Sequence, residues 1–126
     1  MASHTRKTPG DRNLGMRIEL ARLRGGLTQD QLAELLGIKG AAVSHWEAGR
    51  HEPSRNRMNR LSETLHVSVG WLQGELIVTE EDRKLEEALL RLALDGGPEL
   101  LEALLEFESA QDLLEYLRAR KASEKP

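Results

Sequence analysis

Apolar residues recur along this chain at intervals of three and four positions, and polar or glycine-containing segments separate the apolar runs. Such spacing places side chains on one face of an α-helix, whereas a half-buried strand needs strict alternation. The clearest case is the segment 27–53, where the apolar positions form two groups and a glycine follows each, at Gly37 and Gly49. The pattern therefore predicts two short helices joined by a tight connection.

Capping residues mark where the first of these two helices begins and ends. Thr28 is a favourable N-cap, and Gln31 three positions later completes a capping box. Gly37 is suited to a left-handed C-cap. The residues predicted to face inward from this helix are Leu32, Leu35 and Leu36, with Ala33 beside them.

The second helix is predicted over residues 39–48, with Ala42, Val43 and Trp46 facing inward. Gly49 ends it, and Pro53 prevents the chain from continuing as helix. Two helices this short cannot bury a core alone. The segment is therefore either a helix-turn-helix that can enter a DNA groove or part of an ordinary helical bundle, and the pattern alone leaves both open.

Three further helices are predicted around this pair. Asp11 can cap a first helix that runs to about Arg24, after a Pro9-Gly10 pair that argues against regular structure. Ser54 caps a helix that runs to Leu65, and Ser68 caps a short helix that Gly74 ends. The residues predicted to face inward from the first two of these helices are Leu14, Ile18, Ala21, Leu23, Met58, Leu61 and Leu65, with Arg17, Arg22 and Arg24 between those of the first helix. The short helix contains Val69, Trp71 and Leu72.

The C-terminal half is predicted to hold three more helices. Thr79 caps the first, with Asp82 closing the box. Its apolar stripe, formed by Leu85, Ala88, Leu89 and Leu92, is widened by Leu90, Ala93 and Leu94, so this helix is expected to bury two sides. The break at 95–98 precedes helices that start near Glu99 and after Ser109.

Composition agrees with an all-α protein of one domain, or of one small domain with an appendage. Aromatic residues make up only 3%, and the apolar content comes mostly from Leu and Ala. Cysteine is absent, which fits a reducing compartment and excludes disulfides and thiolate metal sites. The N-terminus is polar and no apolar run approaches the roughly 20 residues of a membrane span, so a cytoplasmic, nucleoid-associated location is expected.

Charge is unevenly distributed along the chain. Residues 1–74 carry 11 Lys and Arg against 7 Asp and Glu, a net charge of +4, whereas residues 75–126 carry 7 against 14, a net charge of −7. This asymmetry indicates an anionic partner for the N-terminal half only. An enzyme is not indicated, because the histidines at 4, 45, 51 and 66 lack metal-ligand spacing and no nucleophile–base or phosphate-loop motif is present. Neither a metal nor a cofactor is expected.

Between Leu14 and Glu75 the chain resembles the phage-repressor/Cro-like (XRE) family of helix-turn-helix transcriptional regulators. The motifs that carry the resemblance are Gly26-Leu27-Thr28-Gln29, 32-LAELLGI-38, 43-VSHWEAG-49, Pro53 and 70-GWLQGE-75. They cover about half the chain and make a long, specific string. The resemblance implies a five-helix repressor-like domain whose second motif helix lies in the major groove.

The outward face of that helix, together with its position in the family motif, identifies the residues expected to read bases. We call them the reading face: Lys39, Gly40, Ala41, Ser44 and His45. Many relatives carry Gln, Asn or Arg here, but this chain has none, so direct readout is expected to be modest, with water-mediated contacts and DNA shape contributing more. The expected DNA-backbone contacts are Gln29, which resembles the family's backbone-contacting glutamine, and Arg50, Ser54, Arg55 and Arg57. Simple solvent exposure is the alternative for Arg57.

The resemblance also implies a structural ion pair between Arg22 and Glu47, which would tie the first helix to the recognition helix. Residues 1–12 are expected to form a flexible basic arm, with Arg6 and Lys7 available for phosphates or a minor groove; a disordered tail is the alternative. Residues 13–75 would be the DNA-binding domain, 76–122 a helical oligomerisation region and 123–126 a frayed end.

Thirteen leucines in residues 75–126 are too many for solvated helices, so self-association is expected. The residues expected at a dimer interface are Leu85, Leu89, Leu92, Leu101, Leu104, Leu105, Leu113, Leu114 and Leu117. A two-fold dimer would place two recognition helices about 34 Å apart on a palindromic double-stranded operator. The sequence therefore predicts a homodimeric repressor that occludes a promoter. The alternative is an antitoxin-like module whose C-terminal half binds a toxin, an antirepressor or polymerase.

Overall fold

The computed structural model describes residues 9–75, 77, 79–96 and 119, and every regular element in those residues is a helix. The helices are α1 (Pro9–Arg24), α2 (Gln29–Leu36), α3 (Gly40–Glu47), α4 (Arg55–Leu65), α5 (Val69–Gln73) and α6 (Glu80–Gly96). The all-α prediction is confirmed. The helices predicted from Glu99 and after Ser109 lie outside the described residues.

Local capping sets most of the helix ends. The Thr28 hydroxyl accepts a hydrogen bond from the backbone N–H of Gln31 (3.0 Å), and the Gln31 side chain accepts one from the Thr28 N–H (2.8 Å). This reciprocal pair is the predicted capping box. The hydroxyls of Ser54 and Ser68 cap α4 and α5 by accepting hydrogen bonds from the backbone N–H groups of Arg57 and Trp71. Gly37 and Gly74 end α2 and α5 at a φ of 70°, which a glycine adopts without strain.

The start of α1 was predicted wrongly. The helix begins at Pro9, two residues before the expected cap at Asp11, so residues 9–12 are helical instead of belonging to a flexible arm. Proline is favourable at the first helical position because its fixed φ suits the helix and its missing N–H would have no partner there. Residues 1–8 lie outside the described residues.

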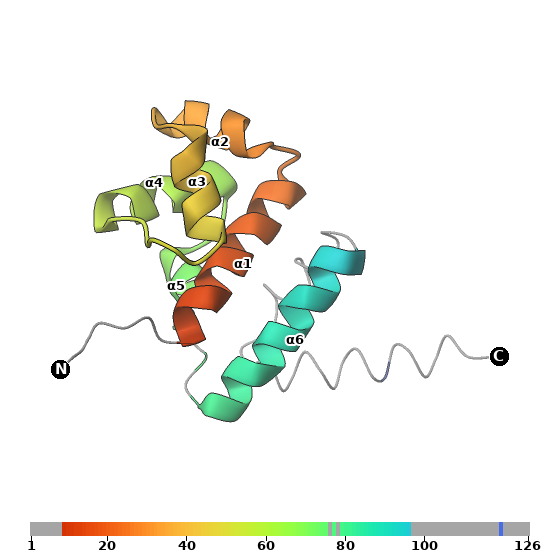
Figure 1. Cartoon of the computed structure of the whole chain (residues 1–126). Coiled ribbons are helices and arrows are strands. Elements are labelled where there is room, and N and C mark those ends of the chain that lie inside the picture. Colours follow the sequence, from red (N-terminus) through yellow and green to blue (C-terminus); the bar gives the residue numbers. More distant parts are fainter. Residues whose placement is uncertain (1–8, 76, 78, 97–118, 120–126) are drawn as a thin grey trace.

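Each of the six helices contributes at least one fully buried side chain to a single core. Ile18, Leu32, Val43, Leu61, Leu72 and Leu90, one from each helix in order, have 0% of their surface exposed. The first five helices thus form the expected compact unit (Figure 1). Helix α2 packs on α3 and α4, and α5 packs on α4 and α1. The inner face of α3, the predicted recognition helix, is therefore packed into this core.

Two leucines predicted to face inward are exposed. Leu35 is 55% exposed because the buried arc of α2 is centred between Leu32, Ala33 and Leu36, and position 35 lies roughly 100° away from that centre. Leu23 in the last turn of α1 is 38% exposed. Met16 and Leu20, which the single-stripe pattern did not include, are buried instead, because α1 is covered on more than one side.

The helices α1 and α3 approach closely at Gly15. A Cβ atom on this residue would lie 2.5 Å from the carbonyl oxygen of Glu47 and 2.7 Å from that of Trp46. Both neighbours are backbone atoms, which cannot move aside as a side chain would. Glycine at this position therefore allows the C-terminal end of α3 to rest directly on α1.

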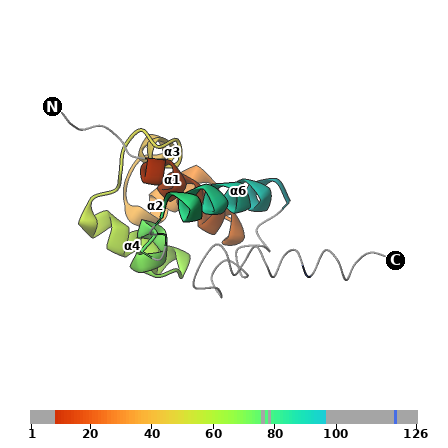
Figure 2. The ribbon, with the colours of Figure 1, turned by 90° about the horizontal axis from the view of Figure 1, so that it is seen from below.

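The sixth helix also packs on α1 (Figures 1 and 2). The hydroxyl of Thr79 accepts a hydrogen bond from the N–H of Asp82 (3.0 Å), so the predicted cap is present. Leu90 and Ala93 are fully buried in the common core, and Leu94 packs against it. This helix was expected in the oligomerisation region, but it is continuous with the core of the first five.

A buried ion pair joins α6 to α1. Arg17 donates from Nε to Glu86 Oε2 (2.7 Å) and from Nη2 to Glu86 Oε1 (2.5 Å), while its Nη1 donates to the Leu72 carbonyl (2.8 Å). The amide of Asn13 donates to Glu86 Oε1 (3.0 Å) and to the Arg83 carbonyl (3.2 Å). The Arg17 and Glu86 side chains are only 3% and 7% exposed. We refer to these contacts as the Arg17–Glu86 junction.

Candidate nucleic-acid interface

The connection between α2 and α3 has the geometry of a helix-turn-helix. Gly37 ends α2 in the left-handed conformation, and its N–H binds the carbonyls of Ala33 and Glu34. Lys39 then adopts an extended conformation as the N-cap of α3, without a side-chain cap. Val43 and Trp46 are buried and Ala42 packs against the core, so the predicted inner face of α3 is confirmed.

The reading face lies on the opposite side of α3. Lys39 and Ala41 are exposed, and Ser44 and His45 are half-buried. Gly40 is half-buried because the Asp30 carboxylate of α2 sits against it, where a Cβ would otherwise be. Any side chain at position 40 would have to displace the Asp30 carboxylate, and glycine itself offers only its backbone to a partner.

A second histidine stands beside the reading face. The rings of His45 and His51 have centroids 5.3 Å apart with planes tilted by 58°. His51 lies in the loop after α3 and is exposed. Sequence reasoning did not include His51, although its position six residues after His45, just beyond the end of α3, could have suggested it.

The residues expected to contact the DNA backbone lie at the two ends of the motif. Arg50, Ser54, Arg55 and Arg57 are exposed in the loop after α3 and at the start of α4. Ser54 is also the N-cap of α4, where its hydroxyl accepts from the Arg57 N–H (3.2 Å). These positions leave the three guanidinium groups on the surface that follows α3. Their contact with DNA stays a prediction.

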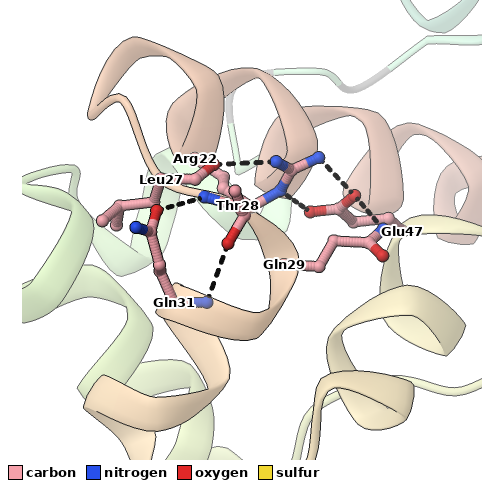
Figure 3. Close-up of polar contacts among 6 residues, drawn as sticks. All are labelled: Arg22, Leu27, Thr28, Gln29, Gln31 and Glu47. Atoms are coloured by element: carbon pink, nitrogen blue, oxygen red, sulfur yellow. Dashed lines mark hydrogen bonds and ion pairs between the residues drawn. The ribbon is translucent and has the colours of Figure 1, made fainter.

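Gln29 has an intramolecular partner that the motif did not indicate. Its amide Nε2 donates to Glu47 Oε1 (2.9 Å), and the residue is half-buried. The hydrogen bond fixes the side chain at the N-terminal end of α2 (Figure 3). A phosphate contact by Gln29 would therefore come from an oriented group instead of a mobile one.

The ion pair between Arg22 and Glu47 is present. Arg22 Nε lies 2.6 Å from Glu47 Oε2 and Arg22 Nη2 lies 3.0 Å from Oε1, while Nη1 donates to the Leu27 carbonyl (2.9 Å) (Figure 3). The two side chains are 10% and 5% exposed. This network connects α1, the α1–α2 turn and the last residue of α3, so it orients the recognition helix from behind.

A third charged group lies close to this pair. Burial raises the pKa of the Glu19 carboxyl above its usual value of 4.5, the negative charge of Glu47 raises it further, and Arg22 opposes both effects. Protonation of Glu19 is therefore easier in the folded protein than in the unfolded chain. The stability it contributes is present below pH 4.5 and is lost as the pH rises through the folded-state pKa.

The leucines expected at a dimer interface are only partly described. Leu85 is half-buried and Leu92 is 52% exposed on α6. Leu89 is 5% exposed within the single chain, which leaves its side chain little surface for a partner. The remaining residues of that prediction, Leu101, Leu104, Leu105, Leu113, Leu114 and Leu117, lie outside the described residues.

Within the described residues there is no group of three or more histidine and carboxylate side chains placed to hold a metal ion. Among the helices described, none is both long and apolar enough to span a bilayer.

Comparison with known proteins gives one consistent family. A model of the helix-turn-helix family matches residues 18–72. The prophage-derived transcriptional regulator YonR of Bacillus subtilis is 31% identical over 114 residues, which cover 87% of this chain and 97% of that protein. The regulator ImmR of the same organism is 30% identical over 81% of this chain and 73% of its own length. The transcriptional activator BcrR of Enterococcus faecalis is 38% identical over 48% of this chain and 31% of that protein.

No solved structure gives a significant match. The long match to YonR and the family model agree with the observed α2–turn–α3 geometry, the fixed inner face of α3 and the capping box. The chain therefore belongs to the helix-turn-helix family of DNA-binding transcriptional regulators.

Proposed function

We propose that this regulator is a homodimeric repressor that binds a palindromic double-stranded operator and occludes a promoter. One observation carries the proposal: the first turn of α3 exposes Lys39 and Ala41, while the Arg22–Glu47 pair and Gly15 hold its other end against α1. A rigid helix with an exposed N-terminal turn is what insertion into a major groove requires.

Charge supports the orientation of the molecule on DNA. The N-terminal half carries the net charge of +4, and the exposed Arg50, Arg55 and Arg57 follow directly after α3. The half that begins at Glu75 carries −7, which directs it away from phosphates. Neutralised phosphates release counterions, so binding should weaken steeply with salt.

Specificity is expected to come only partly from the reading face. Lys39 can donate to guanine, Ala41 can contact a thymine methyl group, and Ser44 and His45 can each bind several bases. None makes the bidentate amide or guanidinium contacts that discriminate best. A second copy and the local shape of the DNA would supply the rest.

Dimerisation is supported by the leucine-rich C-terminal half and by Leu92, which stays exposed on α6. Repression by occlusion needs only occupancy of a promoter and no contact with polymerase. It is therefore the simplest regulatory outcome of DNA binding alone. The similar protein BcrR is named as a transcriptional activator. Whether this chain represses or activates transcription is therefore measured separately from DNA binding.

In vitro selection from random double-stranded DNA with the full chain tests the proposal. We expect two short, inverted half-sites bound by two chains, with the stoichiometry checked by analytical ultracentrifugation. Lys39→Ala should weaken binding and relax the base preference at one position of each half-site, whereas Lys84→Ala on α6, also an exposed lysine, should change neither. Transcription from a promoter that carries the selected site should fall as the protein is added.

Two results would contradict the proposal. A selected site without inverted symmetry, bound by one chain, would remove the homodimer. A protein that purifies with a stoichiometric second protein and enriches no DNA sequence would favour the alternative, an antitoxin-like module.

A further inference from the structure

Helix α1 carries two buried arginine–glutamate pairs on opposite faces. Arg22 pairs with Glu47 of α3, and Arg17 pairs with Glu86 of α6. Gly15, where α3 touches α1, and Arg17 are two positions apart, which separates them by about 200° around a helix. Figure 1 shows the result: α1 lies between α3 on one side and α6 on the other.

The Arg17–Glu86 junction differs from the apolar contacts that surround it. Leu90 and Ala93 hold α6 on α1 through the hydrophobic effect, which has no preferred direction. A bidentate arginine–carboxylate pair has a defined geometry, and here the Leu72 carbonyl and the Asn13 amide restrict it further. The charged pair is therefore the most directional of the contacts between α6 and α1.

The junction is also incompletely hydrogen-bonded, which argues against a purely stabilising role. In the junction, Asn13 Oδ1 is a buried atom without a hydrogen-bond partner. A buried ion pair is often no more stable than an apolar replacement, and the best-documented use of such polar groups is to fix register. The arrangement of Arg17 and Glu86 therefore points to a role in fixing geometry.

We propose that Arg17 and Glu86 are positioning residues that set the separation between the two operator half-sites. This inference rests on the proposed homodimer, in which the leucine-rich C-terminal half that includes α6 joins the two copies. The recognition helix α3 is connected to α6 through two sets of contacts. Gly15 and Arg22 join α3 to α1, and Arg17 and Glu86 join α1 to α6. Neither residue needs to touch DNA to act in this way.

A small tilt of α6 would move its C-terminal end by a distance comparable with the spacing of base pairs in DNA. Helix α6 has 17 residues, so it is about 25 Å long. The part of α6 beyond Glu86 has ten residues and is about 15 Å long, so a tilt of about 10° at the junction would move its far end by roughly 3 Å. That shift is close to the ~3.4 Å rise along the DNA axis between successive phosphates of one strand. A loosened junction would therefore let the two recognition helices occupy half-sites at more than one separation.

Selection from random DNA with the wild type and two adjacent-residue variants tests the inference. Glu86→Gln removes the buried charge, and Glu87→Gln removes a half-buried carboxylate that pairs with Arg91 one turn further along the same helix (3.0 Å). We expect the wild type and Glu87→Gln to return one half-site separation. Glu86→Gln should return the same half-site sequence at several separations, with the preference for the best one falling from about tenfold to about threefold or less.

Two further measurements keep a structural role apart from a positioning role. Thermal unfolding of each variant reports whether it is folded. If Glu86→Gln is not, the double variant Arg17→Met/Glu86→Leu, which removes both charges and keeps apolar volume, takes its place. A merely structural role would weaken binding equally at every separation and leave the preference unchanged.

A folded Glu86→Gln or double variant that returns the single wild-type separation would overturn the inference while leaving the homodimer intact. If the wild type itself returned no paired half-sites, the proposed homodimer would fail, and this inference with it.

Discussion

Replacing Glu47 with alanine is the sharpest test of how the recognition helix is held. The Glu47 carboxylate accepts hydrogen bonds from Arg22 Nε, Arg22 Nη2 and Gln29 Nε2, at 2.6, 3.0 and 2.9 Å. In the variant, the Arg22 guanidinium keeps only the Leu27 carbonyl among these contacts and stays buried, with 10% of its side chain exposed. Leaving one partner of a buried pair uncompensated costs about 3–5 kcal/mol.

That loss is comparable with the total stability of a small domain, which is about 5–15 kcal/mol. With a typical slope of about 2 kcal/mol per M, the urea midpoint should fall by roughly 2 M. Unfolding can be followed by tryptophan fluorescence, because Trp46 next to Glu47 is buried. The matched control is Glu87→Ala, which removes an exposed pair with Arg91 and should cost no more than about 0.5 kcal/mol.

DNA binding by Glu47→Ala should be lost through loss of fold. A stabilising osmolyte, which favours burial, should therefore restore much of the binding. A double-mutant cycle with Arg22→Ala isolates the energy of the pair. A coupling energy near zero, or a Glu47→Ala protein that keeps the wild-type urea midpoint and binds DNA normally, would show that Glu47 does not fix α3 to α1.

Three further substitutions probe separate parts of the fold. Gly15→Ala places a Cβ against the carbonyls of α3 and should destabilise the protein by about 1–3 kcal/mol and weaken DNA binding; unchanged urea midpoints would show that α1 and α3 can move apart freely. Glu19→Gln removes a carboxyl whose pKa is raised in the folded state. As the pH rises above 4.5, the melting temperature of the variant should therefore increase relative to that of the wild type. Plots of melting temperature against pH that run parallel for the two proteins from pH 4 to 7 would contradict this. Leu35→Ala should change stability by less than about 0.5 kcal/mol, because the side chain is 55% exposed, whereas Leu32→Ala should cost about 2–5 kcal/mol; equal losses in chemical unfolding would mean that Leu35 is packed in solution.

Local signals predicted most of the fold. A cap depends on three or four adjacent residues, so Thr28, Ser54 and Ser68 could be identified from the printed sequence alone. The inner face of α3 follows from helical spacing in the same way. Pro9 was misjudged because a proline that breaks the interior of a helix is favourable at its first position.

The packing of α6 on α1 could not be predicted from spacing, since it depends on which helix lies opposite. The sequence nevertheless contained one indication that α6 packs against a charged partner. Glu86 precedes Leu89, Leu90 and Ala93 by three, four and seven positions, so it lies within the apolar stripe of its own helix. A charge in such a place requires a buried partner. Finding Arg17, 69 residues away in the chain, required the structure.

The interface residues divide along similar lines. Helical spacing was enough to place Lys39 and Ala41 on the exposed side of α3. It did not show that Asp30 covers Gly40, or that Gln29 is held by Glu47, because both contacts join different elements.

The Arg17–Glu86 junction also limits how such regulators can exchange parts by recombination. A chimera joined after Glu75 would combine α1 of one protein with α6 of another. Unless the donor carries a matching pair, either Arg17 or Glu86 would be buried without its counter-charge, at a cost of about 3–5 kcal/mol. A chimera joined after Gly96 would take both Arg17 and Glu86 from the same parent protein. The unit that can be inherited as a module is therefore α1 through α6, longer than the part that the helix-turn-helix motif defines.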